Sequence, residues 1–319
     1  MPSHTLSVLG AGGMGSKIAL RLFQRGGGNI LTNLDGRSEA TLKRAQESGM
    51  KHASYSEIIS QATCIYSIVP PKDAFSVAEQ IAAAAQATPS SREVIFVDCN
   101  AISPESVKKM SQLFTGTPIK FIDGAIIGGP PSDTYNPGIY VSANPEDESA
   151  LNEFVALSNN FGLNVIPLGG QGAALGDASA LKMAHAGIVK GTIGLFVAMI
   201  LSSYKSSPST AKGLLHSLSI SQPAFIDQII RLVPQMIPKA YRFVKEMEEI
   251  SDFVGGEERR TYEGIEKVFE RVAAAHDASP NHDSGDTQLL LKFVEDAKEV
   301  WEQSKVGSNP DAIYEYEAS

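Results

Sequence analysis

A glycine-rich segment near the start of the chain has the spacing that binds the phosphates of a dinucleotide. It reads Gly10-Ala-Gly-Gly-Met-Gly15, follows the apolar run 5–9, which predicts a β-strand, and opens a segment of helical periodicity. Gly10 permits a tight turn, Gly12 lets the backbone approach a pyrophosphate, and Gly15 allows the helix to pack closely on the strand. The helix N-terminus adds unpaired N–H groups and positive partial charge. We therefore predict a dinucleotide site that includes Gly10, Gly12, Met14 and Gly15.

The end of the second expected strand, residues 29–34, decides between NAD and NADP. An NAD site usually places an acid there for the ribose 2′-OH, whereas an NADP site places an arginine near the 2′-phosphate. The side chains of Asn33, Arg37 and Ser38 could together bind a phosphate. We therefore expect NADP. NAD stays the alternative because Asp35 could bond a ribose hydroxyl, and a solvent-exposed turn is the alternative without a function.

Two later strands are expected to end at the same crevice, because ligands of open α/β sheets bind outside the carboxyl ends of strands. The run 64–69 ends in Val69-Pro70, and the run 94–98 is followed by Asn100. We expect Val69 and Pro70 to contact the cofactor and Asn100 to contact the nicotinamide or the substrate. For Asn100, a helix-capping or turn residue is the competing interpretation.

Lys182 and His185 are the candidates for chemistry in the second half of the chain. They lie three residues apart on a long helix expected over residues 173–203, and therefore on one helix face. Hydride addition to a carbonyl generates an alkoxide, which needs a proton donor, and a lysine serves if burial lowers its pKa. Lys182 could therefore act as an acid/base, with His185 as an assisting or substrate-binding group, and the family resemblance given below makes this role our prediction. A solvated lysine and a satisfied core histidine are the alternatives.

These candidates must be positioned by two domains. Strand and helix patterns alternate over the first half, which favours a Rossmann domain at residues 1–170 with a parallel sheet and helices on both faces. No convincing strand pattern follows Gly172, so residues 171–319 are expected to form an all-α domain linked to the first by the long helix. The expected elements of the first half are residues 5–9, 16–25, 29–34, 40–48, 64–69, 74–87, 94–98, 104–114, 120–125, 138–142 and 163–167.

Composition excludes several partners. The 319-residue chain has a formal charge of −9, from 27 Lys and Arg against 36 Asp and Glu, so nucleic acid is not an expected partner. Cys64 and Cys99 are expected to be reduced core residues, and the six histidines form no metal-binding motif. No secretory signal is visible, and the apolar stretch 191–204 is too short to span a bilayer. We expect a buried helix there, no membrane contact and a cytoplasmic protein.

Five segments in order resemble the β-hydroxyacid dehydrogenase superfamily, which includes 3-hydroxyisobutyrate dehydrogenase, phosphogluconate dehydrogenase and the imine reductases. Residues 10–15 match its GxGxMG motif, 97–104 (VDCNAISP) resemble its DxSTxxP loop, and 121–129 (FIDGAIIGG) resemble its FxDAPVSGG segment. Residues 172–187 resemble its GxGxxxK helix, in which Lys182 matches the catalytic lysine. Residues 238–250 resemble a C-terminal domain of phosphogluconate-dehydrogenase-like proteins.

The resemblance implies an NAD(P)-dependent dehydrogenase or reductase that acts on a small 3-hydroxy acid or a related carbonyl compound. It also implies a homodimer formed by the helical domain, and substrate contacts at Gly128 and Gly129. Departures from the family pattern include Asn100-Ala101 in place of the loop serine, Ile127, Ala186 and Val189. They argue against phosphogluconate decarboxylation and indicate a more apolar pocket. Further polar residues, interpreted mainly as a solvated face or an interface, are Lys239, Tyr241, Arg242, Glu246 and Glu249.

Two other functions compete with this hypothesis. An imine reductase of the same superfamily usually carries Asp, Tyr or another residue at the position of Lys182, so the lysine favours alcohol or carbonyl chemistry. A non-catalytic dinucleotide sensor is the alternative of a different class, and a lysine retained beside the nicotinamide site argues against it. The sequence does not identify the substrate.

Overall fold

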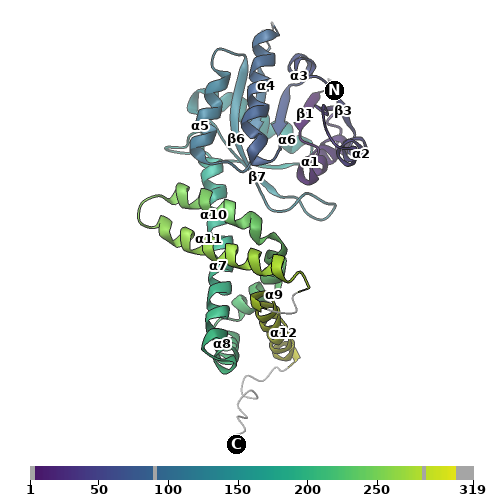
Figure 1. Ribbon diagram of the computed structural model, residues 1–319. Helices are drawn as coiled ribbons and strands as arrows, with labels where there is room; N and C mark the ends of the chain where they lie inside the picture. Colours follow the sequence, from purple (N-terminus) through teal and green to yellow (C-terminus); the bar gives the residue numbers. More distant parts are fainter. Residues whose placement is uncertain (1–3, 89–91, 282–284, 307–319) are drawn as a thin grey trace, which may run out of the picture. The chain divides into compact units, whose positions relative to one another are not determined.

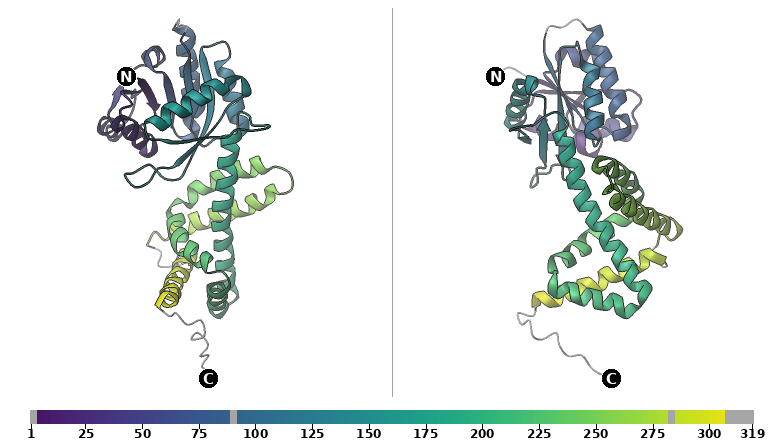
Figure 2. Two further views of the ribbon diagram at one scale, coloured as in Figure 1. Left: turned by 180° about the vertical axis from the view of Figure 1, so that it is seen from behind. Right: turned by 90° about the vertical axis from the view of Figure 1, so that its left-hand side faces the viewer.

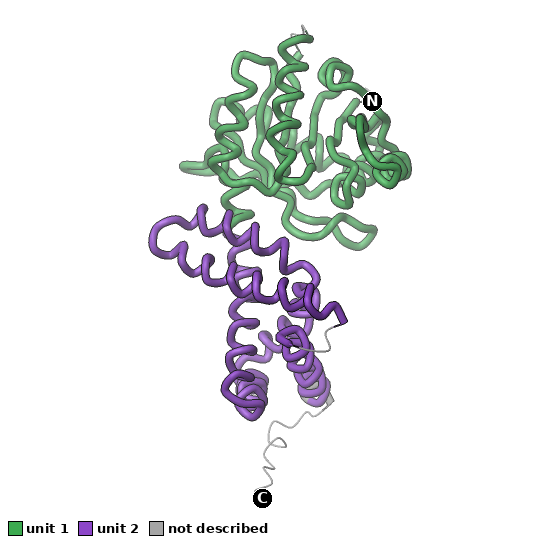
Figure 3. Tube along the Cα trace, in the orientation of Figure 1, with its two compact units in different colours: residues 1–183 green, residues 184–319 purple. Residues whose placement is uncertain are grey.

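The computed structural model describes residues 4–88, 92–281 and 285–306, which form two compact units (Figure 3). Unit 1 comprises Met1–Met183 and unit 2 comprises Ala184–Ser319. The division falls inside a continuous helix, α7 (Asp177–Ser206), whereas the sequence-based boundary at 170/171 precedes that helix and stays a prediction.

Unit 1 contains one eight-stranded sheet. Its strands are β1 (Thr5–Leu9), β2 (Asn29–Thr32), β3 (Met50–His52), β4 (Cys64–Ser67), β5 (Val94–Asp98), β6 (Ile119–Ile127), β7 (Gly138–Ser142) and β8 (Asn164–Pro167). They lie in the order β3-β2-β1-β4-β5-β6-β7-β8, and neighbours pair in parallel except β6 and β7, which are antiparallel. The expected parallel sheet is confirmed for the other six pairs. β6 and β7 are the exception, because residues 128–137 join these two strands without the crossover helix that a parallel pair needs.

Helices cover both faces of this sheet (Figures 1 and 2). They are α1 (Gly13–Gln24), α2 (Glu39–Glu47), α3 (Tyr55–Gln61), α4 (Ala74–Ala87), α5 (Pro104–Ser111) and α6 (Glu148–Asn160), with short 3-10 turns η1 (Pro71–Asp73), η2 (Gln112–Phe114) and η3 (Pro145–Asp147). On one face, Leu22 of α1 and Phe154 of α6 are fully buried against the strands. On the other face, Ile81 of α4 and Val107 of α5 are buried in a second apolar cluster. Both layers follow from amphipathic helices with one apolar stripe.

The long helix α7 begins four residues later than expected, at Asp177. Gly176 has φ +103°, a conformation that a right-handed helix cannot include. The Asp177 carboxylate accepts a hydrogen bond from the Ala174 backbone N–H at 2.9 Å. The glycine turn and this local bond therefore fix the start of the helix.

Unit 2 is entirely helical over its described residues, as the absence of strand patterns predicted. The helices after α7 are α8 (Pro208–Ser221), α9 (Pro223–Met236), α10 (Ala240–Val254), α11 (Arg259–Ala278) and α12 (Gly285–Val306), with a 3-10 turn η4 (Ile237–Lys239). Ser207 begins α8 by accepting a hydrogen bond from the Thr210 backbone N–H. Gly255 and Gly256, both with positive φ, separate α10 from α11.

The apolar part of α7 is more exposed than the sequence predicted. By length and composition alone the helix could cross a membrane, with mean hydropathy 1.7 over its most apolar window, of which only 39% is buried. Ile188, Leu195 and Met199 have 69%, 54% and 56% of their surface exposed. Within residues 191–204 the expectation of a buried helix is confirmed for the face with Ile193, Val197 and Ile200, and it is wrong for the face with Leu195 and Met199.

Candidate active site

The carboxyl ends of three neighbouring strands, β1, β4 and β5, meet at one edge of the sheet, level with the middle of β6. The register aligns Leu9 of β1 with Ser67 of β4, Ser67 with Asp98 of β5, and Asp98 with Asp123 of β6. β1 and β4 are neighbours although β2 and β3 separate them in sequence, so the strand order reverses here. Open α/β sheets bind ligands at such a switch point. The cofactor candidates that follow β1, β4 and β5 therefore share one edge.

The glycine loop after β1 has the geometry that its sequence predicted. Gly10 has φ +104°, and a Cβ there would collide with the Ile68 carbonyl group at the end of β4. A Cβ at Gly15 would collide with the Gly10 carbonyl oxygen, which accounts for the close helix–strand packing. Met14 is half-buried and packs against the core cluster beneath the loop.

The same loop fits the pyrophosphate of a dinucleotide. A Cβ built on Gly12 or Gly13 meets no atom within 4 Å, so the backbone is accessible there. Gly12 is the N-cap of the 12-residue helix α1, and no side chain caps its N-terminal N–H groups. Uncapped N–H groups beside an accessible backbone are the elements that bind phosphate in this motif.

In the turn after β2, the Asn33 side chain forms hydrogen bonds within the protein. Its Nδ2 donates to Asp35 Oδ2 at 2.9 Å and to the Ala53 carbonyl at 3.3 Å, while its Oδ1 accepts from the Asp35 backbone N–H at 3.2 Å. Arg37 is exposed, and Ser38 is the N-cap of α2 with its Oγ 3.1 Å from Thr41 Oγ1. Arg37 and Ser38 are therefore accessible to a ligand, whereas Asn33 shapes the turn.

Arg44 on α2 joins this turn to the glycine loop, which the sequence reasoning did not anticipate. Its Nε donates to the Ala11 carbonyl at 3.1 Å, and its Nη2 donates to Thr41 Oγ1 at 3.0 Å. A guanidinium held beside the loop is a second candidate for a 2′-phosphate. Sequence motifs could not predict this role of Arg44, because its contact with Ala11 depends on how α2 packs.

Asn100 ties together the ends of β4 and β5. It is 2% exposed; its Oδ1 accepts from the Val69 backbone N–H at 2.7 Å and its Nδ2 donates to Ser67 Oγ at 3.0 Å. Nδ2 also donates to the Asp98 carboxylate. The amide thus fixes the segment that contains Val69 and Pro70, in agreement with the turn interpretation. Ligand contact by Asn100, Val69 or Pro70 stays a prediction.

Gly128 and Gly129 follow β6, and both residues are exposed. Gly128 has φ +122°, and a Cβ there would collide with the Tyr135 hydroxyl group. A Cβ on Gly129 meets nothing within 4 Å. The contact of these residues with substrate oxygen atoms stays a prediction.

The start of α7 is anchored to the sheet by Asp123. The carboxylate accepts hydrogen bonds from the Ser179 backbone N–H at 2.9 Å, from Ser179 Oγ at 2.7 Å and from Ser142 Oγ at 3.1 Å. Ser142 Oγ in turn accepts from the Ala178 backbone N–H at 3.0 Å. A carboxylate at a helix N-terminus is also stabilised by the helix dipole. Asp123 therefore fixes the first turn of the helix that carries Lys182.

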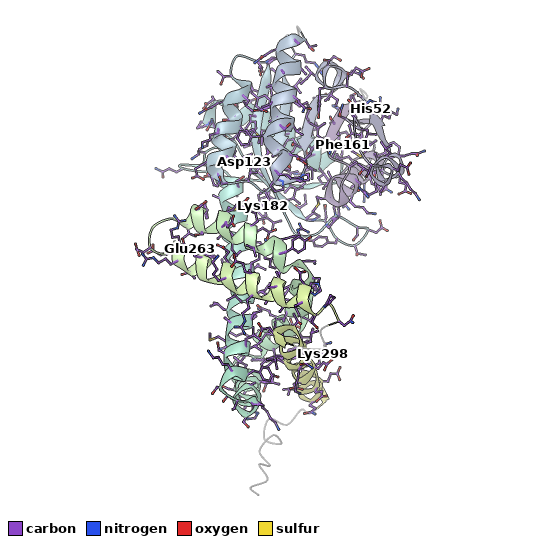
Figure 4. All side chains as sticks on the ribbon, viewed as in Figure 1. His52, Asp123, Phe161, Lys182, Glu263 and Lys298 are labelled. Carbon is purple, nitrogen blue, oxygen red and sulfur yellow. The ribbon has the colours of Figure 1, made fainter. Side chains whose placement is uncertain are left out.

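Lys182 lies one turn after Ser179 and is half-buried. It interacts electrostatically with two buried carboxyl groups, Asp98 and Asp123. Figure 4 labels Lys182 and Asp123. Burial raises the pKa of Asp98 to about 7, and Lys182 opposes that rise. Burial also raises the pKa of Asp123, which the hydrogen bonds from Ser179 and Ser142 and the charge of Lys182 counteract. Sequence reasoning did not select either carboxyl group. Asp98 and Asp123 lie side by side because of the register between β5 and β6, and a local sequence pattern does not predict that register.

The remaining candidates lie in unit 2. His185 is exposed on α7, so its assisting role stays a prediction. Lys190 forms an ion pair with Glu246 and lies 5.2 Å from the centre of the Phe243 ring. Burial raises the pKa of Glu249, while Lys245 and Lys190 lower it. Glu246 therefore belongs to an ion pair rather than to a fully solvated face, whereas Tyr241 is exposed as expected.

The described residues contain no candidate metal site, and the two cavities lie away from the glycine loop. Within the described residues, no group of three or more His, Cys, Asp or Glu side chains could hold a metal ion. A cavity of about 530 Å³ lies between α8 and α12, beside His216 and Lys292, and one of about 270 Å³ lies beside η2 and Lys120. Neither is lined by the glycine loop.

Comparison with known proteins gives two family matches. Residues 5–163 match the NAD binding domain of 6-phosphogluconate dehydrogenase. Residues 206–272 match a domain of unknown function, DUF1932. A search of curated proteins found no match.

Solved structures share the fold. The conserved protein MTH1747, of unknown function and described as similar to 3-hydroxyacid dehydrogenases, is 26% identical, with a TM-score of 0.67 over 85% of this chain and 98% of its own. A 3-hydroxyisobutyrate dehydrogenase from Mycobacterium tuberculosis is 14% identical, with a TM-score of 0.63 over 91% and 99%. A variant imine reductase from Myxococcus stipitatus is 16% identical, with a TM-score of 0.53 over 92% and 100%.

The two domain matches, together with the glycine loop at the switch point, place the chain in the β-hydroxyacid dehydrogenase superfamily. It is an NAD(P)-dependent dehydrogenase or reductase.

Proposed function

We propose that this enzyme prefers NADP and transfers hydride between the nicotinamide and a small hydroxy acid or related carbonyl compound, with Lys182 as the acid/base. The observation that carries the proposal is the position of Lys182. It interacts with two buried carboxyl groups, Asp98 at the carboxyl end of β5 and its register partner Asp123 in the middle of β6.

In this mechanism the bound nicotinamide supplies or accepts the hydride. Lys182 donates a proton to the substrate oxygen as negative charge develops on it, and removes that proton in the oxidative direction. Asp123 holds the helix turn that precedes Lys182, so the amine starts from a fixed backbone. Backbone N–H groups at Gly128 and Gly129 bind substrate oxygen atoms, and His185 assists by hydrogen bonding.

Three features support NADP over NAD. Arg37 and Ser38 are accessible after β2, and Arg44 is held against Ala11 of the glycine loop. Two guanidinium groups with a hydroxyl suit a 2′-phosphate, because charge-assisted hydrogen bonds are about twice as strong as neutral ones. Asp35 opposes this preference, but its carboxylate accepts from Asn33 and lies 3.7 Å from His52 Nε2.

We also propose a homodimer that forms through α7, in a cytoplasmic enzyme. Ile188, Thr192, Leu195 and Met199 repeat at the three- and four-residue spacing of a coiled-coil seam, and the three apolar members are exposed. A contiguous apolar face on a protein in water is stabilised by a partner. A second copy presents the same seam, and therefore matches it.

A substrate screen tests the proposed activity. The panel contains 3-hydroxy acids, other small hydroxy acids and cyclic imines, and the absorbance of the reduced nicotinamide follows NADP reduction or NADPH oxidation. We expect a hydroxy acid or its carbonyl product to turn over and to need Lys182. Turnover of imines alone would favour the imine reductase hypothesis. Tight NADPH binding with no turnover of any member would favour a dinucleotide sensor.

A further inference from the structure

Two carboxyl groups lie side by side in the core of unit 1 with unequal hydrogen bonding. Asp98 and Asp123 are register partners on adjacent parallel strands, and both are 0% exposed. Asp123 accepts three hydrogen bonds, two from Ser179 and one from Ser142. Asp98 accepts hydrogen bonds from Asn100 alone, and its buried Oδ2 has no hydrogen-bond partner among the described residues.

This asymmetry decides which group holds the negative charge. A buried carboxylate needs hydrogen-bond donors, and two neighbouring carboxylates repel each other. Asp123 has the donors and the N-terminus of α7, so its ionised form is stabilised. Asp98 faces the charge of Asp123 with Asn100 as its only hydrogen-bonding residue, and burial together with this charge raises its pKa to about 7 although Asn100 and Lys182 oppose the rise.

Other titratable groups around Asp98 do not supply the missing stabilisation. The Cys99 thiol is fully buried, and burial together with the neighbouring Asp98 raises its pKa, so it stays neutral. Lys182 is the cation that acts on Asp98, and it acts on Asp123 as well. One ammonium group therefore serves two carboxyl groups.

We propose that Asp98 keeps a proton in the resting enzyme, so that Lys182 faces one carboxylate, Asp123, until Asp98 ionises and adds a second. Asp98 is thus a positioning residue: it orients Asn100 and sets how tightly Lys182 holds its proton. Ionised Asp98 favours the protonated amine, which reduction needs, and disfavours the neutral amine, which oxidation needs. The consequence for catalysis rests on the proposed role of Lys182, whereas the proton on Asp98 does not.

Infrared spectroscopy tests the proton directly. We expect the wild type to show the carbonyl stretch of a buried protonated carboxylic acid near pH 6, and to lose it as the pH rises past neutrality. Asp98→Asn, which has the shape of the protonated acid, should lack this band. Asp123→Asn, the matched control, should keep the band but lose it at a lower pH, because the charge that helps to raise the pKa of Asp98 is gone. Absence of the band in the wild type, or its persistence in Asp98→Asn, would overturn the proposal.

The second readout follows Lys182 itself. Lysines labelled by ¹³C reductive methylation are titrated by NMR, and Lys182 is assigned by the signal missing from Lys182→Met. In Asp98→Asn its titration midpoint should fall by about one pH unit, a tenfold weaker hold on the proton, because one nearby carboxylate is lost. An unchanged midpoint would contradict the coupling. Failure of the proposed enzyme activity would leave both spectroscopic results intact, so the two proposals can fail separately.

Discussion

The two units use polar side chains in opposite ways. In unit 1 the polar groups that matter are buried in the sheet, as in the row formed by Ser67, Asp98, Asp123 and Ser142. In unit 2 they lie largely on helix surfaces, where Arg231–Asp227, Arg259–Glu263 and Lys292–Asp296 join residues four apart. Such exposed pairs contribute little to stability, because solvent screens the charges.

Apolar side chains show the reverse contrast. Unit 1 buries its large apolar residues in two clusters, on the two faces of the sheet. Unit 2 leaves Ile188, Leu195, Met199 and Ile220 more than half exposed. Unit 1 therefore holds its chemical groups in fixed positions, whereas unit 2 exposes an apolar surface, which the proposed homodimer would cover.

The largest expected effect comes from the amine of Lys182, next to the residue at which the two units divide. Lys182→Met keeps the apolar stem but removes the proton donor, so kcat should fall by about 10²–10⁴-fold while NADPH binding is retained. Steady-state kinetics with a substrate from the screen measure this, and fluorescence titration measures NADPH binding. The matched control is Lys190→Met on the same helix, whose partner is Glu246. A loss below about tenfold for Lys182→Met would remove Lys182 from the mechanism.

The buried row should make stability depend on pH. The pKa of Asp98 is about 7 in the folded protein against an ordinary value of 3.8. The folded state therefore binds the Asp98 proton more tightly than the unfolded state does. The resulting contribution to the free energy of unfolding is fully present below pH 3.8 and is lost as the pH rises through 7. Each pKa unit corresponds to about 1.4 kcal/mol, so the wild type should lose at most roughly 4 kcal/mol of unfolding free energy over this pH range. Asp98→Asn has no proton to lose at this position and should not show this loss. Urea unfolding of both proteins at about pH 5 and pH 8, on either side of the folded pKa, checks this, and an equal stability difference at both values would contradict it.

The exposed seam of α7 predicts a concentration-dependent dimer. Leu195→Glu places a charge in the proposed interface, which costs several kcal/mol if the residue becomes buried. The dimer dissociation constant should therefore rise by at least about a hundredfold, as measured by light scattering and sedimentation. Leu42→Glu, at an exposed apolar residue of α2 in unit 1, is the control. A wild-type protein that stays monomeric at micromolar concentration contradicts the proposal.

The smallest effect is expected at the cofactor turn. Arg37→Ala and Arg44→Ala should each weaken NADP(H) binding by roughly 10- to 150-fold, the equivalent of about 1.5–3 kcal/mol, and change NAD(H) binding much less. Calorimetric titration of both cofactors measures the preference. Lys43→Ala removes an exposed charge on the same helix, at a residue whose partner is Glu47, and serves as the control. Equal or tighter NAD binding by the wild type would reverse the assignment.

Much of the fold could be predicted because periodicity and glycine spacing are local signals. The bounds of β1, α4, β5 and β7 match the expected ranges, and the glycine loop has the expected conformation. Two missed helices also carried readable signals. Ser54 and Glu57 form a capping box at the start of α3, and Leu151 and Phe154 mark the buried stripe of α6.

The rest depends on contacts between residues distant in sequence. The antiparallel direction of β7 could not be predicted, because no sequence pattern shows whether residues 128–137 cross over the sheet. Asp98 and Asp123 meet only through strand register, and Arg44 reaches Ala11 only through the packing of α2. From the sequence, Asn33 was predicted to bind a phosphate. In the structure its amide donates hydrogen bonds to Asp35 and to the Ala53 carbonyl group, and the contact with Ala53 could not be predicted from neighbouring residues.

The anchoring of α7 by Asp123 has a consequence for how the chain is made. The strand that bears Asp123 leaves the ribosome well before the first turn of α7, because Ser179 lies 56 residues later in the chain. Until that turn emerges, the nascent sheet holds a carboxylate without its helical donors. Domains generally fold from the N-terminus as units during synthesis. A fragment that ends at residue 167 should therefore be cut by protease faster than one that ends at residue 183, although both contain every strand.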